Sequence, residues 1–291
     1  MSESVDINGV RRATVHGLDA VIIESGHSTA AISVFGGQVI SFVPAGSDTD
    51  VLWVSPQLAA VPTPIRGGVP VCWPYFAREG QSGDVPSHGY ARTAEWTLTG
   101  GARTDAGVDL ELEPLGLDHL AVGLRMTVHV GTHLEMGLHT HNPGDEPATI
   151  TEAFHNYFRV SDATDVHVEG LAGLPYLDKF DDMRTHEQQG DWALPHDLPR
   201  SDRVYSGSGG RYRLIDPDLR RTITVAARSA RSAVVWNPGE AGAATMGDVG
   251  AHWREFVCVE AANVGPDVVS VPAGATHSMW QTIAVSDQPA D

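Results

Sequence analysis

The sequence has two cysteines, no long apolar run and no visible leader segment. Cys72 and Cys258 both lie in apolar stretches, which favours a reduced intracellular protein without structural disulfides. No stretch approaches the roughly 18 consecutive apolar residues that a membrane-spanning helix requires. Residues 1–12 are polar and lack the apolar core of a signal peptide. We therefore expect a cytoplasmic protein.

Basic residues are also scarce. The chain has 19 Lys and Arg against 37 Asp and Glu, a formal net charge of −18. This balance opposes binding to nucleic acid and to anionic membranes. An anionic substrate would need a local cluster of arginines that works against the overall field. The expected partner is a small molecule, with no nucleic acid and no membrane, and a monomer is favoured while the oligomeric state stays open.

No segment keeps a convincing helical period. The chain has 31 Gly and 18 Pro, and hydrophobic residues make up 42% of its 291 residues, so it can form a packed core interrupted by frequent turns. Short β-rich runs recur along it, at residues 20–24, 30–35, 38–43, 51–54, 94–98, 108–112, 120–130, 134–141, 166–168, 212–215, 222–226, 233–236, 255–260 and 281–285. Such spacing predicts an all-β fold, a large antiparallel β-sandwich or barrel. No break in composition divides the chain, so we expect one domain over residues 1–291, with a loose segment at residues 1–12.

One run near the middle of the chain, residues 150–160, mixes aromatic and polar side chains. In a strand, His155 and Tyr157 would share one face while Phe154 and Phe158 share the other. The two phenylalanines suit a core, and an imidazole beside a phenol suits a polar cleft. Taken alone, His155 fits a hydrogen-bonded structural histidine better than a catalytic one.

Residues 63–96 break the strand pattern. The part from 64 to 76 is too rich in Pro and Gly for a central strand, and too apolar for an ordinary surface loop. Arg66 precedes two glycines that allow a ligand to approach the backbone closely. With His88 and Arg92 it indicates an oxyanion or sugar-phosphate site. The alternative is that the aromatic residues plug one end of a sandwich.

These segments resemble a known family. The motifs that carry the resemblance are Arg66-Gly-Gly-Val-Pro-Val-Cys-Trp-Pro-Tyr-Phe, His88-Gly-Tyr-Ala-Arg-Thr-Ala-Glu-Trp and Thr151-Glu-Ala-Phe-His-Asn-Tyr-Phe. Further matches are Gly36-Gly-Gln-Val-Ile-Ser-Phe, Val51-Leu-Trp-Val-Ser, Tyr176-Leu-Asp-Lys-Phe, Asp202-Arg-Val-Tyr, Val234-Val-Trp-Asn-Pro and Val257-Cys-Val-Glu-Ala-Ala-Asn-Val. Together they resemble the hexose-6-phosphate mutarotases, also called glucose-6-phosphate 1-epimerases, of the galactose-mutarotase-like (aldose 1-epimerase) superfamily. The matches run in order from about residue 36 to about residue 277.

The resemblance implies a large β-sandwich with a sugar site in a cleft on one face. It also implies cofactor-independent interconversion of the α and β anomers of an aldohexose 6-phosphate, without a metal. The implied roles are general acid for His155, general base for Glu260, phosphate contacts for Arg66 and Arg92, and sugar contacts for His88 and Asp178. The chain departs from the family pattern at Tyr90, where Phe is usual, at Ala261, where Pro is common, and at residues 239–246, where a Trp and a lysine-containing segment are usual.

The chemistry suits the implied pair. Opening a sugar ring requires a base at the C1 hydroxyl and an acid at the ring oxygen, but no redox centre. Histidine has a reference pKa of ~6.5, and partial burial raises that of a carboxylate towards neutrality. Glu260 follows the apolar run 256–259, where a carboxylate is costly unless it is satisfied or functional. The alternative for Glu260 is a strand-end glutamate that faces water.

Other functions stay open on the sequence alone. A non-catalytic carbohydrate-binding module on the same fold would not need a paired acid and base. A mutarotase for unphosphorylated aldoses would leave the two arginines without a role, unless carboxylates pair with them. A metal-dependent cupin-type enzyme would use the histidines at positions 129, 133, 139 and 141. The preferred hexose 6-phosphate also stays open.

Overall fold

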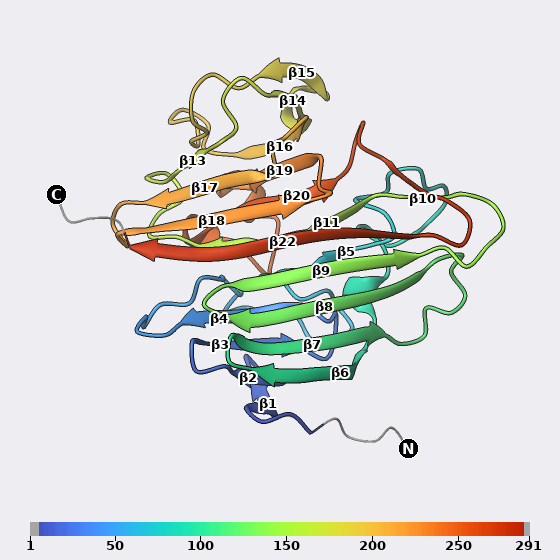
Figure 1. Cartoon of the computed structure of the whole chain (residues 1–291). Helices are drawn as coiled ribbons and strands as arrows, with labels where there is room; N and C mark the ends of the chain where they lie inside the picture. The colour runs from blue at the N-terminus through green and yellow to red at the C-terminus, as the bar shows by residue number, and fades with distance from the viewer. Residues whose placement is uncertain (1–5, 288–291) are drawn as a thin grey trace.

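The computed structural model describes residues 6–287, and antiparallel strands dominate it (Figure 1). The first large sheet, called here the β22 sheet, has the order β13 (His167–Glu169), β17 (Arg211–Asp216), β18 (Arg221–Arg228), β22 (Thr276–Asp287), β9 (Leu134–His141), β8 (Gly123–Gly131), β7 (Gly107–Pro114) and β6 (Trp96–Thr104). The second, the β20 sheet, has the order β15 (Arg184–Glu187), β14 (Pro175–Asp178), β16 (Ser201–Ser206), β19 (Ser232–Asn237), β20 (Phe256–Asn263), β11 (Glu152–Phe154) and β5 (Val71–Cys72), and β12 (Tyr157–Arg159) also pairs with β20. The predicted all-β sandwich is confirmed.

Two smaller sheets and four short helical segments complete the described chain. One sheet has the order β1 (Val10–Val15), β2 (Leu18–Glu24), β3 (Ser28–Ser33) and β4 (Val39–Pro44), and the other pairs β10 (Ala148–Ile150) with β21 (Val269–Val271). The helical segments are η1 (Ala91–Thr93), η2 (Lys179–Asp181), α1 (Gly239–Ala243) and η3 (Gly250–Glu255). No helix within residues 6–287 is both long and apolar enough to cross a membrane.

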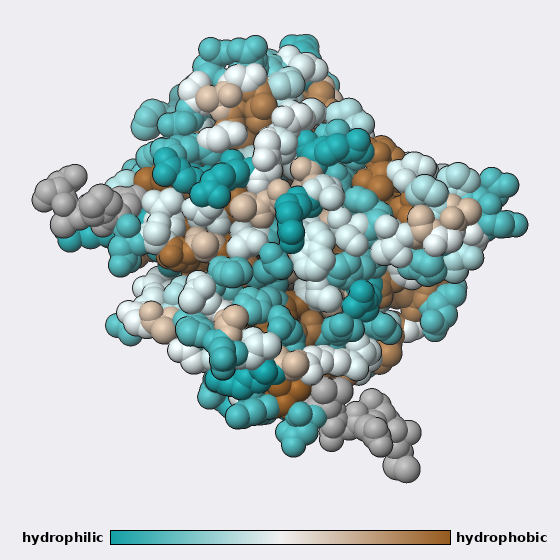
Figure 2. Space-filling model, in the orientation of Figure 1, coloured by the Kyte–Doolittle hydropathy of each residue, from teal (hydrophilic) through white to brown (hydrophobic). Residues whose placement is uncertain are grey.

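The β22 sheet has one buried and one solvated face. In β7, Val108, Leu110 and Leu112 are buried, whereas Asp109 and Glu111 between them are exposed. This alternation is typical of an antiparallel sheet that covers a core with one face. The view in Figure 2 looks onto this side of the molecule, where hydrophilic residues predominate and hydrophobic ones are scattered.

The centre of the β20 sheet is buried on both faces, and every residue of β20 is buried. The large core lies on one face. On the other face lies a second cluster of mostly small residues, Cys72, Phe76, Ala153, Val204, Val234, Ala262 and Val264. Strand pairing places Val204 opposite Val234, and Val234 opposite Glu260. Because paired residues of an antiparallel sheet point the same way, Glu260 rises from this second face among small side chains.

The run over residues 150–160 is not one continuous strand. β11 ends at Phe154 and β12 begins at Tyr157, with a break at His155 and Asn156. The Asn156 amide group donates to the Val259 carbonyl oxygen at 2.8 Å and to Gln281 Oε1 at 2.9 Å. These bonds satisfy the buried Asn156 amide group at the break. The chain can therefore interrupt its pairing with β20 there and turn His155 towards the second face.

Two further local predictions are wrong. Residues 1–12 are not all loose, because the last three belong to β1, where cross-strand ion pairs join it to β2; residues 1–5 lie outside the described part. Residues 51–54 form no strand. They make isolated bridges to Phe158 on one side and to Gly67 on the other, so neither ladder extends far enough to make a strand.

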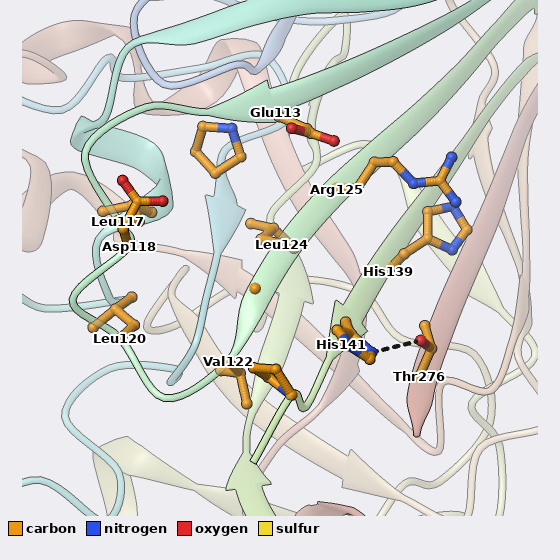
Figure 3. A pocket seen from close by; sticks show the side chains of 13 residues that line it. Glu113, Leu117, Asp118, Leu120, Val122, Leu124, Arg125, His139, His141 and Thr276 are labelled. Carbon is orange, nitrogen blue, oxygen red and sulfur yellow. Dashed lines mark hydrogen bonds between the residues drawn. The ribbon is translucent and has the colours of Figure 1, made fainter. Parts of the chain in front are cut away.

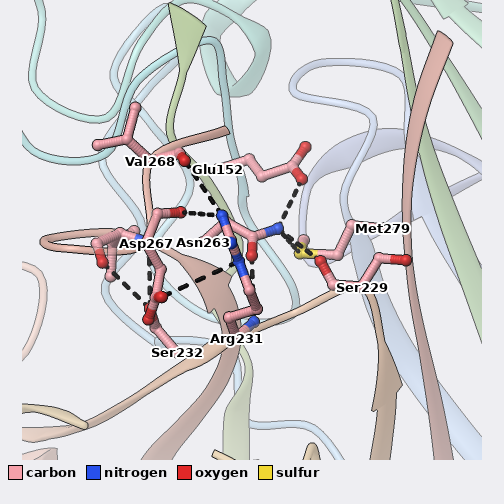
Figure 4. Close-up of polar contacts among 9 residues, drawn as sticks. Glu152, Ser229, Arg231, Ser232, Asn263, Asp267, Val268 and Met279 are labelled. Carbon is pink, nitrogen blue, oxygen red and sulfur yellow. Dashed lines mark hydrogen bonds and ion pairs between the residues drawn. The ribbon is translucent and has the colours of Figure 1, made fainter. Parts of the chain in front are cut away.

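The end of β20 is anchored by a polar network (Figure 4). The Asn263 amide group donates to Glu152 Oε1 at 3.0 Å and to the Ser229 carbonyl oxygen at 2.7 Å. Its oxygen accepts from the Arg231 backbone N–H at 3.1 Å. These contacts hold the strand firmly at a point close to Glu260.

Candidate active site

His155 occupies the break between β11 and β12 and is 8% exposed. Its backbone N–H donates to the Pro70 carbonyl oxygen at 3.0 Å. The imidazole ring stacks on Tyr157, with ring centroids 4.8 Å apart and planes within 7°, and Trp236 meets it edge-on at 5.9 Å. The two aromatic rings therefore fix the orientation of the imidazole.

Glu260 lies beside this ring, and its side chain is buried. Oε1 of Glu260 lies 3.5 Å from Nδ1 of His155. Neither carboxylate oxygen accepts a hydrogen bond from a described residue, and His155 Nδ1 also lacks one. A buried carboxyl group without hydrogen bonds costs stability, so its presence beside an equally unpartnered imidazole points to chemistry rather than to folding.

Burial shifts the two groups in opposite directions. It raises the pKa of Glu260 well above its ordinary value, with Asp202 adding to the shift and Lys179 opposing it. Burial also lowers the pKa of His155 well below its ordinary value, and His88, Arg66 and Arg92 lower it further. Both shifts favour uncharged side chains. Burial therefore favours the arrangement in which the carboxyl group holds the proton and the imidazole is neutral.

His88 lies against His155, with ring centroids 5.8 Å apart. Its Nδ1 accepts a hydrogen bond from the Ala77 backbone N–H at 3.2 Å, and Phe76 packs against its ring. Burial, with a contribution from Arg92, lowers the pKa of His88 to about 3. The ring is therefore neutral, and because Nδ1 is an acceptor, Nε2 carries the hydrogen and can donate to a sugar oxygen.

Arg66 approaches the same pair from the loop before β5. Its Nε donates to Asp248 Oδ2 at 3.0 Å, and its Nη1 donates to the Tyr157 hydroxyl at 3.0 Å. Tyr157 and Asp248 raise the pKa of Arg66, so the guanidinium stays charged. Through Tyr157, Arg66 also supports the ring that stacks on His155.

The two glycines after Arg66 serve packing rather than ligand approach, so that part of the prediction is wrong. A Cβ atom at Gly67 would lie 2.4 Å from the Trp53 carbonyl oxygen, and one at Gly68 would lie 2.3 Å from the Val39 carbonyl oxygen. Both residues have positive φ. Glycine is therefore required because this segment passes directly against neighbouring backbone.

Arg92 is the second predicted arginine and lies in η1. Its Nη2 donates to the Ser87 carbonyl oxygen at 2.6 Å, and its Nε is buried without a hydrogen bond to any described residue. Burial lowers the pKa of Arg92. The structure thus brings three predicted positions (66, 88 and 92) together around the fourth, His155, which lies beside Glu260.

Asp178 does not join them. In the strand register it pairs with Arg203, while Leu177 pairs with Val204 on the face of Glu260. Asp178 accordingly lies on the opposite face, 3.7 Å from the Arg203 guanidinium, and its Oδ1 accepts from the backbone N–H of Phe180.

Two residues that the sequence did not single out lie near Glu260 instead. Lys179 and Asp202 form an ion pair at 3.1 Å, and both influence the pKa of Glu260. Burial raises the pKa of Asp202 itself. Both residues belong to motifs that resemble the family, so the sequence marked their segments. It did not show that Lys179, rather than its neighbour Asp178, lies on the face of Glu260.

The histidine-rich strands lie elsewhere. His139 and His141 line a cavity of about 500 Å³ over β8 and β9 (Figure 3). His139 is held by Thr127 and Ser278, and His129 by Asp109. Within residues 6–287 the four histidines provide no group of three ligands close enough to share a metal ion. They therefore do not support the cupin-type alternative.

Comparison with known proteins identifies the family of this chain. The family model for aldose 1-epimerase matches residues 19–284. A protein of Salmonella typhimurium, provisionally named glucose-6-phosphate 1-epimerase, is 34% identical over 86% of this chain and 84% of its own length. A protein of Escherichia coli K12 with the same provisional name is 34% identical over 84% of this chain and 83% of its own length.

A solved structure shares the architecture. The crystal structure of a provisionally assigned mutarotase from Salmonella typhimurium superimposes with a TM-score of 0.85 and 30% identity, covering 96% of this chain and 94% of that chain. The family match extends over most of the chain and includes Glu260 and the residues gathered around His155. This protein belongs to the aldose 1-epimerase family and is an isomerase.

Proposed function

We propose that this isomerase interconverts the α and β anomers of an aldohexose 6-phosphate without a cofactor. The observation that supports this most directly is the buried pair of His155 and Glu260, whose facing atoms have no hydrogen-bond partner among the described residues. A carbohydrate-binding module would gain nothing from such a costly pair. The relatives named glucose-6-phosphate 1-epimerase support the choice of substrate class.

The pair performs both proton transfers of ring opening. Glu260, as the carboxylate, takes the proton of the C1 hydroxyl, and His155, as the imidazolium, protonates the ring oxygen O5. The C1–O5 bond breaks, the C1 aldehyde forms, and rotation about the C1–C2 bond presents its other face to O5. Ring closure returns both protons. Each transfer contributes ~10²–10⁴-fold when the group is well placed.

A single proton, held by one or the other member of the pair, is enough for this cycle. Ring opening leaves the pair as neutral His155 and protonated Glu260, the arrangement that burial favours. A bound cyclic sugar must therefore stabilise the charged arrangement, in which the proton lies on His155. Hydrogen bonds from C1–OH to the carboxylate and from the imidazolium to O5 provide that stabilisation at the reacting atoms.

The phosphate group is assigned to Arg66 and Arg92, with His88 as a donor to the sugar. Both arginines lower the pKa of His155 electrostatically, so both lie near the reacting pair. They provide a local positive field within a chain of net charge −18.

A second candidate, a mutarotase for unphosphorylated aldoses, is favoured by one observation. Asp248 and Tyr157 already engage the Arg66 guanidinium. Anomer exchange measured by NMR on glucose and on glucose 6-phosphate separates the two candidates. We expect much faster exchange of the phosphorylated sugar. Equal rates would exclude phosphate as a recognised group, and no catalysed exchange of any aldose would exclude the mutarotase itself.

The arginine assignment needs a matched control. Arg92→Ala should reduce kcat/KM for the phosphorylated sugar and leave glucose almost unchanged. Arg125→Ala is the control, because Arg125 pairs with Glu111 on the β22 sheet and lines the separate cavity of Figure 3. Unchanged phosphate preference in Arg92→Ala would contradict its role.

A further inference from the structure

A separate group of chemically active side chains lies at the edge of the β22 sheet. His167 and Glu169 flank Val168 in β13. Val168 and Trp192 exchange two backbone hydrogen bonds, of 2.8 and 2.9 Å, which brings Asp191 alongside. One ligand atom from each of the imidazole and the two carboxylates lies within 4.8 Å of the others.

The strand alternation explains why these three side chains meet. Val168 and Trp192 are fully buried, so the residues beside them point away from the core. His167 and Asp191 donate or accept no side-chain hydrogen bond with the other described residues, whereas Glu169 pairs with Arg213, whose Nε lies 2.5 Å from Oε2. The carboxylates of Glu169 and Asp191 therefore converge with one cation, Arg213. This leaves a local negative charge beside the His167 imidazole.

We propose that His167, Glu169 and Asp191 form a binding site for a divalent transition-metal ion such as Zn²⁺. One imidazole nitrogen and two carboxylate oxygens form a donor set that suits Zn²⁺, with water at the remaining position. Mg²⁺ and Ca²⁺ prefer oxygen donors alone, so the histidine disfavours them. The net charge of −18 raises the local concentration of cations.

The ion would act on the fold rather than on the sugar. Trp192 Nε1 donates to Ser201 Oγ at 3.2 Å, and the next residue is Asp202, which faces Glu260. An ion that joins Asp191 to β13 therefore holds the segment that leads into the candidate active site. Because the ion binds only the folded chain in this geometry, it should raise the melting temperature in a concentration-dependent way.

Titration of the full-length, untagged, metal-free protein with Zn²⁺ in a calorimeter tests the site. We expect one ion per chain. His167→Gln and Asp191→Asn should each weaken binding by about tenfold or more. His186→Gln is the matched control, since His186 also faces a carboxylate, Asp181, at 2.8 Å, but belongs to no group of three ligands.

A fourth variant tests the competition at Glu169. Arg213→Gln should tighten Zn²⁺ binding because Glu169 then serves the ion alone, and weaker binding in this variant would contradict the proposal. Absence of a stoichiometric site in the wild type, or binding that survives both His167→Gln and Asp191→Asn, would overturn it. Sugar is absent from the titration, so these outcomes are independent of the proposed mutarotase activity.

Discussion

Replacing Glu260 by leucine should stabilise the fold while it removes activity. The Glu260 carboxyl group is buried and receives no hydrogen bond from a described residue. A buried polar group left unsatisfied costs about 1–3 kcal/mol, and leucine, of similar length, removes that cost. We therefore expect Glu260→Leu to raise the free energy of unfolding by roughly that amount. The loss of the base should lower kcat by roughly 10²-fold or more.

The stability gain should depend on pH. The pKa of Glu260 is raised well above its ordinary value of 4.5 in the folded chain. Such a group weakens the fold progressively as pH rises from the unfolded pKa to the folded one, because the unfolded chain releases the proton more readily. The advantage of Glu260→Leu over the wild type should thus be smallest near pH 4.5 and larger at neutral pH.

A second buried carboxylate provides the control. Asp216 is also 0% exposed, but it accepts hydrogen bonds from the backbone N–H and the hydroxyl of Ser161, at 2.8 and 2.7 Å, and from the Leu219 N–H at 3.0 Å. Asp216→Asn replaces one accepting carboxylate oxygen by a donating NH₂ group and should destabilise the fold by about 1–3 kcal/mol. The two substitutions should therefore have opposite signs.

Urea unfolding followed by tryptophan fluorescence measures the stability, and NMR exchange on glucose 6-phosphate measures the activity. If Glu260→Leu loses stability as Asp216→Asn does, the carboxyl group has stabilising contacts and the argument from its isolation fails. If the variant keeps near-wild-type exchange, Glu260 is not the base.

Three further predictions follow from the same site. The pH–rate profile, measured from about pH 4 to about pH 10, should fall on the acid side only below the ordinary imidazole range. Burial lowers the pKa of His155, so a second proton, which would inactivate the pair, binds only at a pH below the ordinary imidazole range. An acid limb centred near 6.5 would contradict this. Lys179→Met should move the alkaline limb upward, since it removes the charge that opposes the raised pKa of Glu260, and an unchanged limb would exclude this coupling. Exhaustive dialysis against EDTA should leave the exchange rate of His167→Gln unchanged, because this variant lacks the inferred Zn²⁺ site and the proposed reaction uses side chains only. A lost rate that added metal restores in this variant would refute that.

The sequence singled out candidate site residues where a motif keeps them in one short segment. Arg66, His88, Arg92 and His155 were proposed in this way, and their side chains lie close together in the structure. Asp178 lies apart from them because successive residues of a strand face opposite sides of the sheet. The motif around it lies at a strand end, and only the pairing with β16 shows which side it faces.

Long-range partners account for the other differences. The break beside His155 depends on Asn156, whose amide bonds to Val259 and Gln281, more than 100 residues away. Nothing in the local alternation of residues 150–160 indicates such contacts. Sequence periodicity therefore predicted the strands but not the interruption that gives the histidine its orientation.

If the protein selects phosphate as proposed, the selection should depend on which cationic side chain lacks a carboxylate partner rather than on how many cations are present. Salt screens the charge of −18 over roughly 8–10 Å, so neighbouring groups decide. Asp248 pairs with Arg66 and Asp202 pairs with Lys179, whereas Arg92 has no carboxylate partner among the described residues and keeps an unpartnered Nε. A charge-assisted hydrogen bond contributes about 1.5–3 kcal/mol, or roughly 10- to 100-fold in kcat/KM. Arg92→Ala should therefore cost glucose 6-phosphate exchange more than Arg66→Ala does, and the reverse order would show that phosphate displaces Asp248 from Arg66.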